Sequence, residues 1–142
     1  MNKKKLINVL ILGSGGREHA IAWKISQSKF IGKIYVAPGN SGTSSIAINL
    51  PLNIYNHNEI RDVITSHLID LLIIGPEGPL VKGLHNKLAN MNELANLTII
   101  GPKKEGAQLE GSKAFSKKFM EKYKIPTADF KSFNSAEISD AI

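Results

Sequence analysis

The sequence of 142 residues contains no cysteine. Disulfides, zinc–thiolate sites and cysteine nucleophiles are therefore excluded, and we expect a cytoplasmic location, because a reducing compartment suits such a chain. Long apolar runs are missing too. The stretch 6–12, which follows three lysines, has seven residues, whereas a membrane span needs about 20. It continues into a charged, glycine-rich segment without a cleavage pattern, so we interpret it as a buried strand and expect no membrane partner.

Acidic residues are scarce in the first half of the chain, with none between Glu18 and Glu59, and the net charge is +6. Eight of the eighteen basic residues are lysines between positions 103 and 131, and four aromatic residues lie among them: Phe115, Phe119, Tyr123 and Phe130. This composition suits either a nucleic-acid patch or an amphipathic helix with a solvated lysine face and a buried aromatic stripe. The aromatic residues recur at helical spacing, so we favour the helix and expect no nucleic-acid partner.

Apolar segments and turn residues alternate along the first hundred residues. Helices are predicted at 18–27, 56–68 and 80–90, and strands at 6–12, 33–37, 46–50, 71–74 and 98–100. In the second of these helices Asn56 is the expected N-cap, and Glu59 completes the spacing of a capping box. Alternating strands and helices predict an α/β fold, a Rossmann-like parallel sheet with helices on both faces, over residues 1–102. Its glycine- and proline-rich loops should then gather at the carboxyl ends of the strands, where such sheets bind ligands.

The regular alternation of predicted strands and helices ends after residue 102. Helices are expected at 103–109 and 112–123, a strand at 128–133, and a further helix from Ser135. A chain that stops just after the start of a helix suggests a fragment. We therefore expect residues 103–142 to be linker helices and the beginning of a second, incomplete domain.

The first strand is followed by a glycine turn and a helix start. Glycines at 13, 15 and 16 allow backbone N–H groups to approach a ligand, and a helix N-terminus followed by Arg17 favours a phosphate. A dinucleotide site is the rival interpretation, but Glu18 stands where that pattern needs Gly or Ala, and no acidic residue follows the second strand. The remaining alternative is a glycine turn that only packs a helix on a strand.

Three other segments carry weaker signals. Glu77, between rigid turn residues, could accept hydrogen bonds from sugar hydroxyls or an amine, or favour the N-terminus of the next helix. Asn40 lies in a turn-forming segment, 38–43. Residues 106–113 look like a phosphate-binding P-loop, but their order is Gly-Ser-Lys rather than Gly-Lys-Ser, so we reject a P-loop NTPase. The four histidines show no spacing typical of metal ligands.

Five motifs occur in order along nearly the whole chain. They are Gly15-Gly16-Arg17-Glu18-His19-Ala20, Ala37-Pro38-Gly39-Asn40-x-Gly42-Thr43, Asp70-x-x-x-x-Gly75-Pro76-Glu77-x-Pro79-Leu80-Val81-x-Gly83, Leu109-Glu110-Gly111-Ser112-Lys113-Ala114-Phe115 and Ile125-Pro126-Thr127-Ala128. The set resembles the phosphoribosylamine–glycine ligases of purine biosynthesis, which are ATP-grasp enzymes. The resemblance implies a Rossmann-like pre-ATP-grasp domain followed by the start of an ATP-grasp domain. It also implies ATP with magnesium, and glycine and 5-phosphoribosylamine as substrates joined through an acyl phosphate.

Carried over by the resemblance, Gly13, Gly15, Gly16 and Arg17 would hold the 5-phosphate of phosphoribosylamine. Glu77 would contact its ribose hydroxyls or amine, Asn40 and Gly42 would line the same cleft, and Lys113 would approach the ATP phosphates. One departure is Asn86, where the family pattern implies an aspartate. We expect no catalytic residue and no metal ligand within these residues, an inactive fragment, and a monomer at full length.

Three alternatives stay open beside the ligase. One is another ATP-grasp carboxylate–amine ligase that shares the same first domain. Another is a non-catalytic sugar-phosphate or nucleotide-binding module. A basic nucleic-acid binder is the alternative that the sequence favours least.

Overall fold

The computed structural model describes residues 6–133 and residue 137. The chain divides into two compact units, Met1–Ala107 and Gln108–Ile142. The domain boundary predicted at residue 102 stays a prediction. The assignment of the second unit to an ATP-grasp domain stays a prediction.

The first unit is built on a parallel sheet. Its strands are β1 (Ile7–Gly13), β2 (Ile31–Pro38), β3 (Ile48–Asn49), β4 (Leu71–Ile74) and β5 (Thr98–Ile100). They are arranged in the order β3-β2-β1-β4-β5, and every neighbouring pair is parallel. The predicted α/β class with a Rossmann-like parallel sheet is confirmed.

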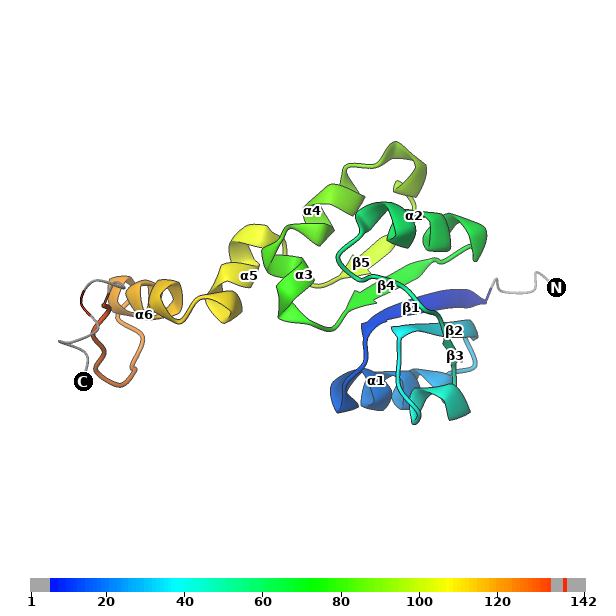
Figure 1. Ribbon diagram of the computed structural model, residues 1–142, viewed down its shortest axis with the longest axis horizontal. Helices are drawn as coiled ribbons and strands as arrows, with labels where there is room; N and C mark the ends of the chain where they lie inside the picture. Colours follow the sequence, from blue (N-terminus) through cyan, green and yellow to red (C-terminus); the bar gives the residue numbers. More distant parts are fainter. Residues whose placement is uncertain (1–5, 134–136, 138–142) are drawn as a thin grey trace. The chain divides into compact units, whose positions relative to one another are not determined.

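Helices cover both faces of this sheet (Figure 1). Helix α1 (Gly16–Ser26) packs through Ala22 on one face, against Val9 and Ile11 of β1. On the other face, Leu10 and Leu12 pack with α2 (His57–Ser66), α3 (Glu77–Val81) and α4 (Leu84–Ala89). Residues Val9 to Leu12 are fully buried, which explains why β1 is continuously apolar rather than alternating.

Two elements differ from their predicted extents. The strand expected at 46–50 is only Ile48–Asn49, because a 3₁₀ turn η1 (Thr43–Ser45) precedes it and the carbonyl of Thr43 accepts the N–H groups of Ile46 and Ala47. The helix expected at 80–90 is two helices, α3 and α4. Gly83 separates them with φ +81, a left-handed conformation that ends one helix before the next begins.

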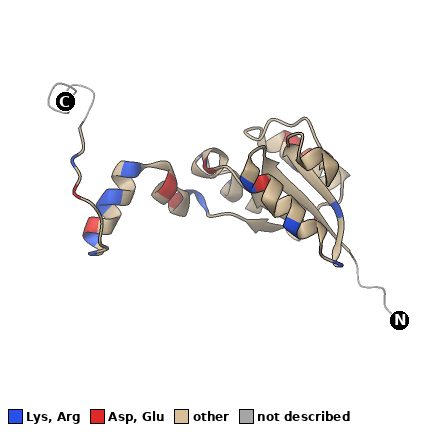
Figure 2. Ribbon diagram, turned by 90° about the horizontal axis from the view of Figure 1, so that it is seen from below, with Lys and Arg blue, Asp and Glu red and all other residues tan. Residues whose placement is uncertain are grey.

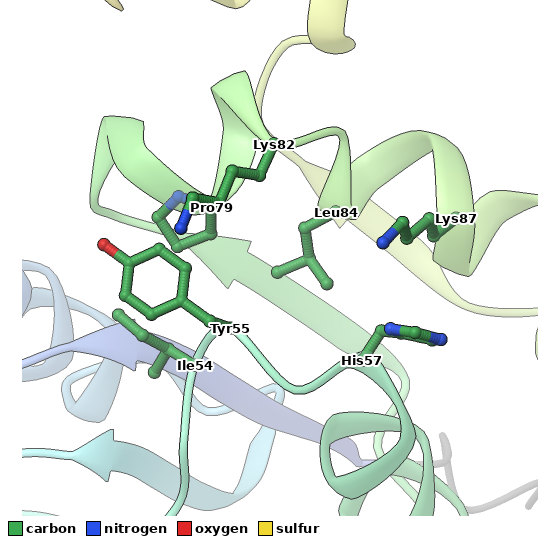
Figure 3. Close-up of a pocket in the computed structure, with 7 residues that line it drawn as sticks. All are labelled: Ile54, Tyr55, His57, Pro79, Lys82, Leu84 and Lys87. Atoms are coloured by element: carbon green, nitrogen blue, oxygen red, sulfur yellow. The ribbon is translucent and has the colours of Figure 1, made fainter.

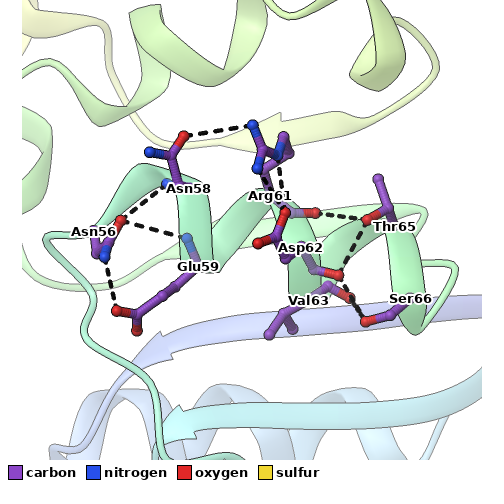
Figure 4. Close-up of polar contacts among 8 residues, drawn as sticks. All are labelled: Asn56, Asn58, Glu59, Arg61, Asp62, Val63, Thr65 and Ser66. Atoms are coloured by element: carbon purple, nitrogen blue, oxygen red, sulfur yellow. Dashed lines mark hydrogen bonds and ion pairs between the residues drawn. The ribbon is translucent and has the colours of Figure 1, made fainter.

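The N-terminus of α2 carries the predicted cap (Figure 4). The side-chain oxygen of Asn56 accepts the N–H groups of Asn58 at 3.1 Å and Glu59 at 3.4 Å. The reciprocal half of the capping box is different: Glu59 accepts from the side-chain amide of Asn56 at 2.7 Å and from the N–H of Asn53 at 3.2 Å. The backbone N–H of Asn56 instead donates to the carbonyl of Asn53. The N-cap is confirmed, but Glu59 accepts from the side-chain amide of Asn56 rather than from its backbone N–H.

The C-terminal region contains α5 (Lys104–Gly111), which runs across the boundary between the units, and α6 (Lys113–Lys122). Ser112 caps α6 by accepting the N–H of Phe115 at 3.3 Å. The expected strand at 128–133 is wrong: the described residues there form no ladder, and a strand needs a neighbour to exchange hydrogen bonds. The helix expected from Ser135 falls largely outside the described residues.

The predicted helix at 112–123 is confirmed as α6, but its predicted buried aromatic stripe is wrong. Phe115 is 44% exposed and Tyr123 is 57% exposed, and α6 has no buried residue. Within residues 108–133 the structure describes no sheet, and the only other helical residues are those of the last turn of α5. Lysines lie along the helix (Figure 2). Among the helices that the structure describes, none is long and apolar enough to cross a membrane.

We expect Asn56→Ala to lower the free energy of unfolding by about 1 kcal/mol, because two N–H groups of the first turn of α2 lose their acceptor. Urea denaturation followed by far-ultraviolet circular dichroism measures the change. Asn58→Ala is the matched control, since Asn58 is an exposed residue of the same turn whose side chain only meets Arg61. An equal loss in both variants would contradict the role of the cap.

Candidate functional site

The candidate site is the carboxyl edge of the sheet around β1. The N–H of Gly39, after β2, donates to the carbonyl of Gly13, and the N–H of Gly75, after β4, donates to the carbonyl of Leu12, both at 3.1 Å. The chain runs outward from β1 to β2 and β3, and then returns to place β4 on the other side of β1. Crevices at such a reversal of strand order are where open α/β sheets bind ligands. The glycine turn and the loop that leads to Glu77 therefore meet at this point.

The side chain of Glu18 fills the space beneath the glycine turn. This residue is only 3% exposed. One carboxylate oxygen accepts the N–H of Gly15 at 2.7 Å, and the other forms an ion pair with Nε of Arg17 at 3.1 Å. A Cβ added to Gly13 would lie 2.7 Å from this carboxyl group, and one added to Gly75 would overlap it. Both strand ends therefore carry glycine because the carboxylate occupies the room of a side chain.

This arrangement leaves one of the predicted phosphate donors occupied within the protein and the others free. The N–H of Gly15 is already used by Glu18. Gly16 and Arg17 lie in the first turn of α1, whose N–H groups have no intrahelical acceptor. A Cβ added to Gly16 would meet nothing within 4 Å, and the Arg17 side chain is 56% exposed. The outer side of the turn is thus open, with the positive end of the helix dipole behind it.

The turn after β2 is tied to the glycine turn by Asn40. Its side-chain amide donates to the carbonyl of Ser14 at 2.8 Å, and its side-chain oxygen accepts the N–H groups of Gly42 at 2.8 Å and Thr43 at 3.0 Å. A Cβ added to Gly42 would lie 2.5 Å from the ring of His19. These contacts explain Asn40 and Gly42 within the protein. Their predicted contact with a substrate stays a prediction.

Glu77 is the first residue of α3 and is exposed. Its carboxylate accepts no hydrogen bond from the residues that the structure describes, and α3 has no side-chain cap. The side chain is therefore available to a ligand from the loop that follows β4. The hydroxyl of Tyr55 lies against the next residue, because a Cβ added to Gly78 would be 2.6 Å from that oxygen.

A small cavity opens next to α3 (Figure 3). Its volume is about 20 Å³, which is room for roughly one water molecule. The ammonium of Lys82 lies 4.4 Å from the centre of the Tyr55 ring. The cavity is too small for a sugar phosphate. Only Pro79 among its lining residues belongs to one of the five motifs, and none of them is a predicted site residue. The lining residues are Ile54, Tyr55, His57, Pro79, Lys82, Leu84 and Lys87.

The remaining predicted residues are Lys113, which belongs to the second unit, and Asn86, which bonds within the first. Lys113 is the exposed first residue of α6, in the second unit. The side-chain oxygen of Asn86 accepts the N–H of Lys104 at 2.9 Å, and an aspartate would offer the same acceptor. Within the part of the chain that the structure describes, no three His, Asp or Glu side chains group into a metal site.

Glu18 is the site residue that the sequence did not reveal. In the sequence it breaks the dinucleotide pattern and belongs to the first of the five ordered motifs, but neither observation gives it a role at the site. The signal that could have found it is its spacing from Gly15, since a glutamate three residues after an N-cap is the acidic half of a capping box. That spacing explains the bond to Gly15 but not the contact with Gly75, which comes from another strand.

Comparisons with known proteins agree with the sequence motifs. The family described as "Phosphoribosylglycinamide synthetase, N domain" matches residues 7–110. Curated phosphoribosylamine–glycine ligases are 45% identical over 130 residues in Rhodopirellula baltica and 44% identical over 133 residues in Escherichia coli strain K12. Each alignment covers 92% of this chain but only 29% and 30% of the relative, respectively. The chain thus spans about a third or less of the length of these relatives.

Solved structures extend the comparison to the fold. A phosphoribosylamine–glycine ligase from Thermotoga maritima is 31% identical with a TM-score of 0.62, over 95% of this chain and 30% of that one. An N5-carboxyaminoimidazole synthase from Aspergillus clavatus also has a TM-score of 0.62, over 97% of this chain and 36% of that one. Its identity is 16%, so it shows a shared fold alone. Because the family match covers most of the chain, this protein belongs to the phosphoribosylglycinamide synthetase N-domain family.

Proposed function

We propose that this chain is the N-terminal, substrate-binding part of a phosphoribosylamine–glycine ligase of de novo purine biosynthesis, acting in the cytoplasm as a monomer at full length. The observation that carries the proposal is the open first turn of α1, where Gly16 and Arg17 face outward at the reversal of strand order. Such a turn suits the 5-phosphate of phosphoribosylamine. Membership of the family supports the choice of this substrate.

The proposed reaction has a physical reason for needing a shaped site. A carboxylate is a poor acyl donor, because its leaving group would be an oxide. When glycine is phosphorylated at the expense of ATP, the acyl phosphate has phosphate as its leaving group. The amine of phosphoribosylamine then attacks the carbonyl carbon, the amide bond forms and phosphate departs. The enzyme must hold the amine in line with this carbonyl and keep water away.

In this scheme the residues of the first unit bind and orient one substrate. The N–H groups of Gly16 and Arg17, together with the guanidinium, hold the phosphate. Gly13 and Gly15 leave room for the side chain beneath the turn, and Asn40 ties this turn to the next one. Glu77, whose carboxylate is exposed, accepts hydrogen bonds from the ribose hydroxyls or the amine.

ATP and magnesium fit this chain only in part. Lys113 offers one exposed ammonium that suits a phosphate. The described residues offer no carboxylate group that would hold Mg²⁺. We therefore assign ATP and magnesium binding mainly to the regions of the longer ligases that this chain does not match.

A non-catalytic sugar-phosphate-binding module is the second candidate. It is favoured by the short coverage, about 30% of the curated relatives. It would use the same open turn, and only turnover distinguishes the two. Another ATP-grasp ligase is less favoured, because curated relatives at 44–46% identity share one name.

We expect Arg17→Ala to weaken binding of ribose 5-phosphate by about tenfold to a hundredfold, because a charge-assisted hydrogen bond to phosphate contributes roughly 1.5–3 kcal/mol. Isothermal titration calorimetry measures the affinity. Arg61→Ala is the matched control: it also removes an arginine from a helix, where it pairs with the neighbouring Asp62. Unchanged affinity in the Arg17 variant would mean that the glycine turn only packs a helix on a strand.

Gly16→Ala separates binding from folding. The added methyl meets no protein atom within 4 Å, so the free energy of unfolding should stay unchanged or rise by up to about 1 kcal/mol. The same methyl would occupy the space through which a phosphate approaches, so we expect affinity for ribose 5-phosphate to fall by at least about tenfold. Urea denaturation and calorimetry give the two numbers. Gly106→Ala, within α5, is the control, and wild-type affinity in Gly16→Ala would place the phosphate elsewhere.

Turnover tests whether residues 1–142 catalyse the reaction by themselves. We expect residues 1–142 alone to show no glycine-dependent ATP hydrolysis in the presence of phosphoribosylamine. A coupled assay for ADP release measures it, with a full-length relative as the positive control. Hydrolysis by the short chain would overturn the proposal that its matched region only binds substrate.

A further inference from the structure

We propose that Glu18 is a positioning residue of the phosphate-binding turn. Its carboxylate holds the N–H of Gly15 and Nε of Arg17 from beneath, and so presents Gly16 and the Arg17 side chain to the phosphate. The inference rests on the proposed function, because it concerns the same turn. It adds a residue that contacts no substrate and acts through its two neighbours.

The room for this side chain is built from two separate strand ends. Gly13 ends β1 and Gly75 follows β4, and a Cβ on either would collide with the carboxyl group of Glu18. A Cβ on Gly15 would lie 3.0 Å from Oε2. Three glycines therefore enclose one buried carboxylate at the reversal of strand order. The glycines at 13 and 75 are needed to leave room for the carboxylate, and the glycine at 15 allows it to lie close to the turn.

The contact with Arg17 leaves the outer part of the guanidinium free. Of the guanidinium donors, only Nε–H donates to Glu18, at 3.1 Å. The guanidinium has five N–H donors, so the four on its two terminal nitrogens can still reach a ligand. The Arg17 side chain is 56% exposed while that of Glu18 is 5% exposed. The arginine is thus anchored at its base with its end directed to solvent, which suits a two-point contact with phosphate.

The competing explanation is that the carboxylate is a placeholder. It would occupy the N–H of Gly15 in the free protein and leave when a phosphate arrives. The geometry favours positioning, because Glu18 is enclosed beneath the turn while the open space lies outside Gly16. The two explanations also predict opposite changes in phosphate affinity when the charge of Glu18 is removed. A negative charge beside an anion site repels the anion, so removing a mere placeholder should strengthen binding.

The first experiment needs no variant. The ¹⁵N-labelled chain is titrated with ribose 5-phosphate and followed by NMR. We expect the backbone amide signals of Gly16 and Arg17 to move while that of Gly15 moves little, because its hydrogen bond to Glu18 persists. A largest shift at Gly15 would mean that the carboxylate is displaced, and would overturn the positioning role. No shift in the whole turn would instead refute the phosphate site, and with it the proposed function.

The second experiment removes the charge and keeps the shape. Glu18→Gln can still accept from Gly15 but no longer holds both donors, so we expect about tenfold weaker binding of ribose 5-phosphate. Glu59→Gln is a close control, since Glu59 occupies the same third position of α2 and also accepts from its cap residue. Affinity equal to or tighter than wild type in a folded Glu18→Gln would overturn the inference. If that variant does not fold, the titration of the wild type decides.

Discussion

The hydrogen bond between the Gly15 N–H and the buried Glu18 carboxylate is the interaction on which the candidate site depends. It holds the first turn of α1 over the end of β1, and the same carboxylate lies against Gly75 after β4. Because the carboxylate meets an arginine and a backbone N–H at once, it is compensated in spite of its burial. The outward face of the turn is left with the free donors that an anion requires.

Around this contact, the sheet decides which loops can cooperate. β1 is central and buried on both faces, and its neighbours β2 and β4 end at the same edge. Asn40 joins the turn after β2 to the glycine turn, and Glu18 joins the loop after β4 to it. Two polar side chains thus fix three loops relative to one another, which is the rigidity that a site for orienting a substrate needs.

The second unit shows where local signals reach their limit. α6 begins within one residue of its predicted start, because the cap at Ser112 and the helix-forming residues after it are local in the sequence. Burial of Phe115 and Tyr123 would require a neighbouring element that covers both, and within residues 108–133 both side chains are exposed. Helical spacing predicts which residues share a face, but it says nothing about what covers that face.

The sequence by itself determined the parallel α/β fold, the glycine turn before α1, the cap at Asn56 and the family, because each follows from residues close together or from ordered motifs. It missed the break at Gly83 within a continuous apolar pattern, and the shortening of β3 by η1. Only the tertiary structure decided that Glu18 fills the turn and divides its donors. The physical reason is that the space for this carboxylate is shared by glycines 13 and 75, which are distant in sequence and meet only when β1 pairs with β4.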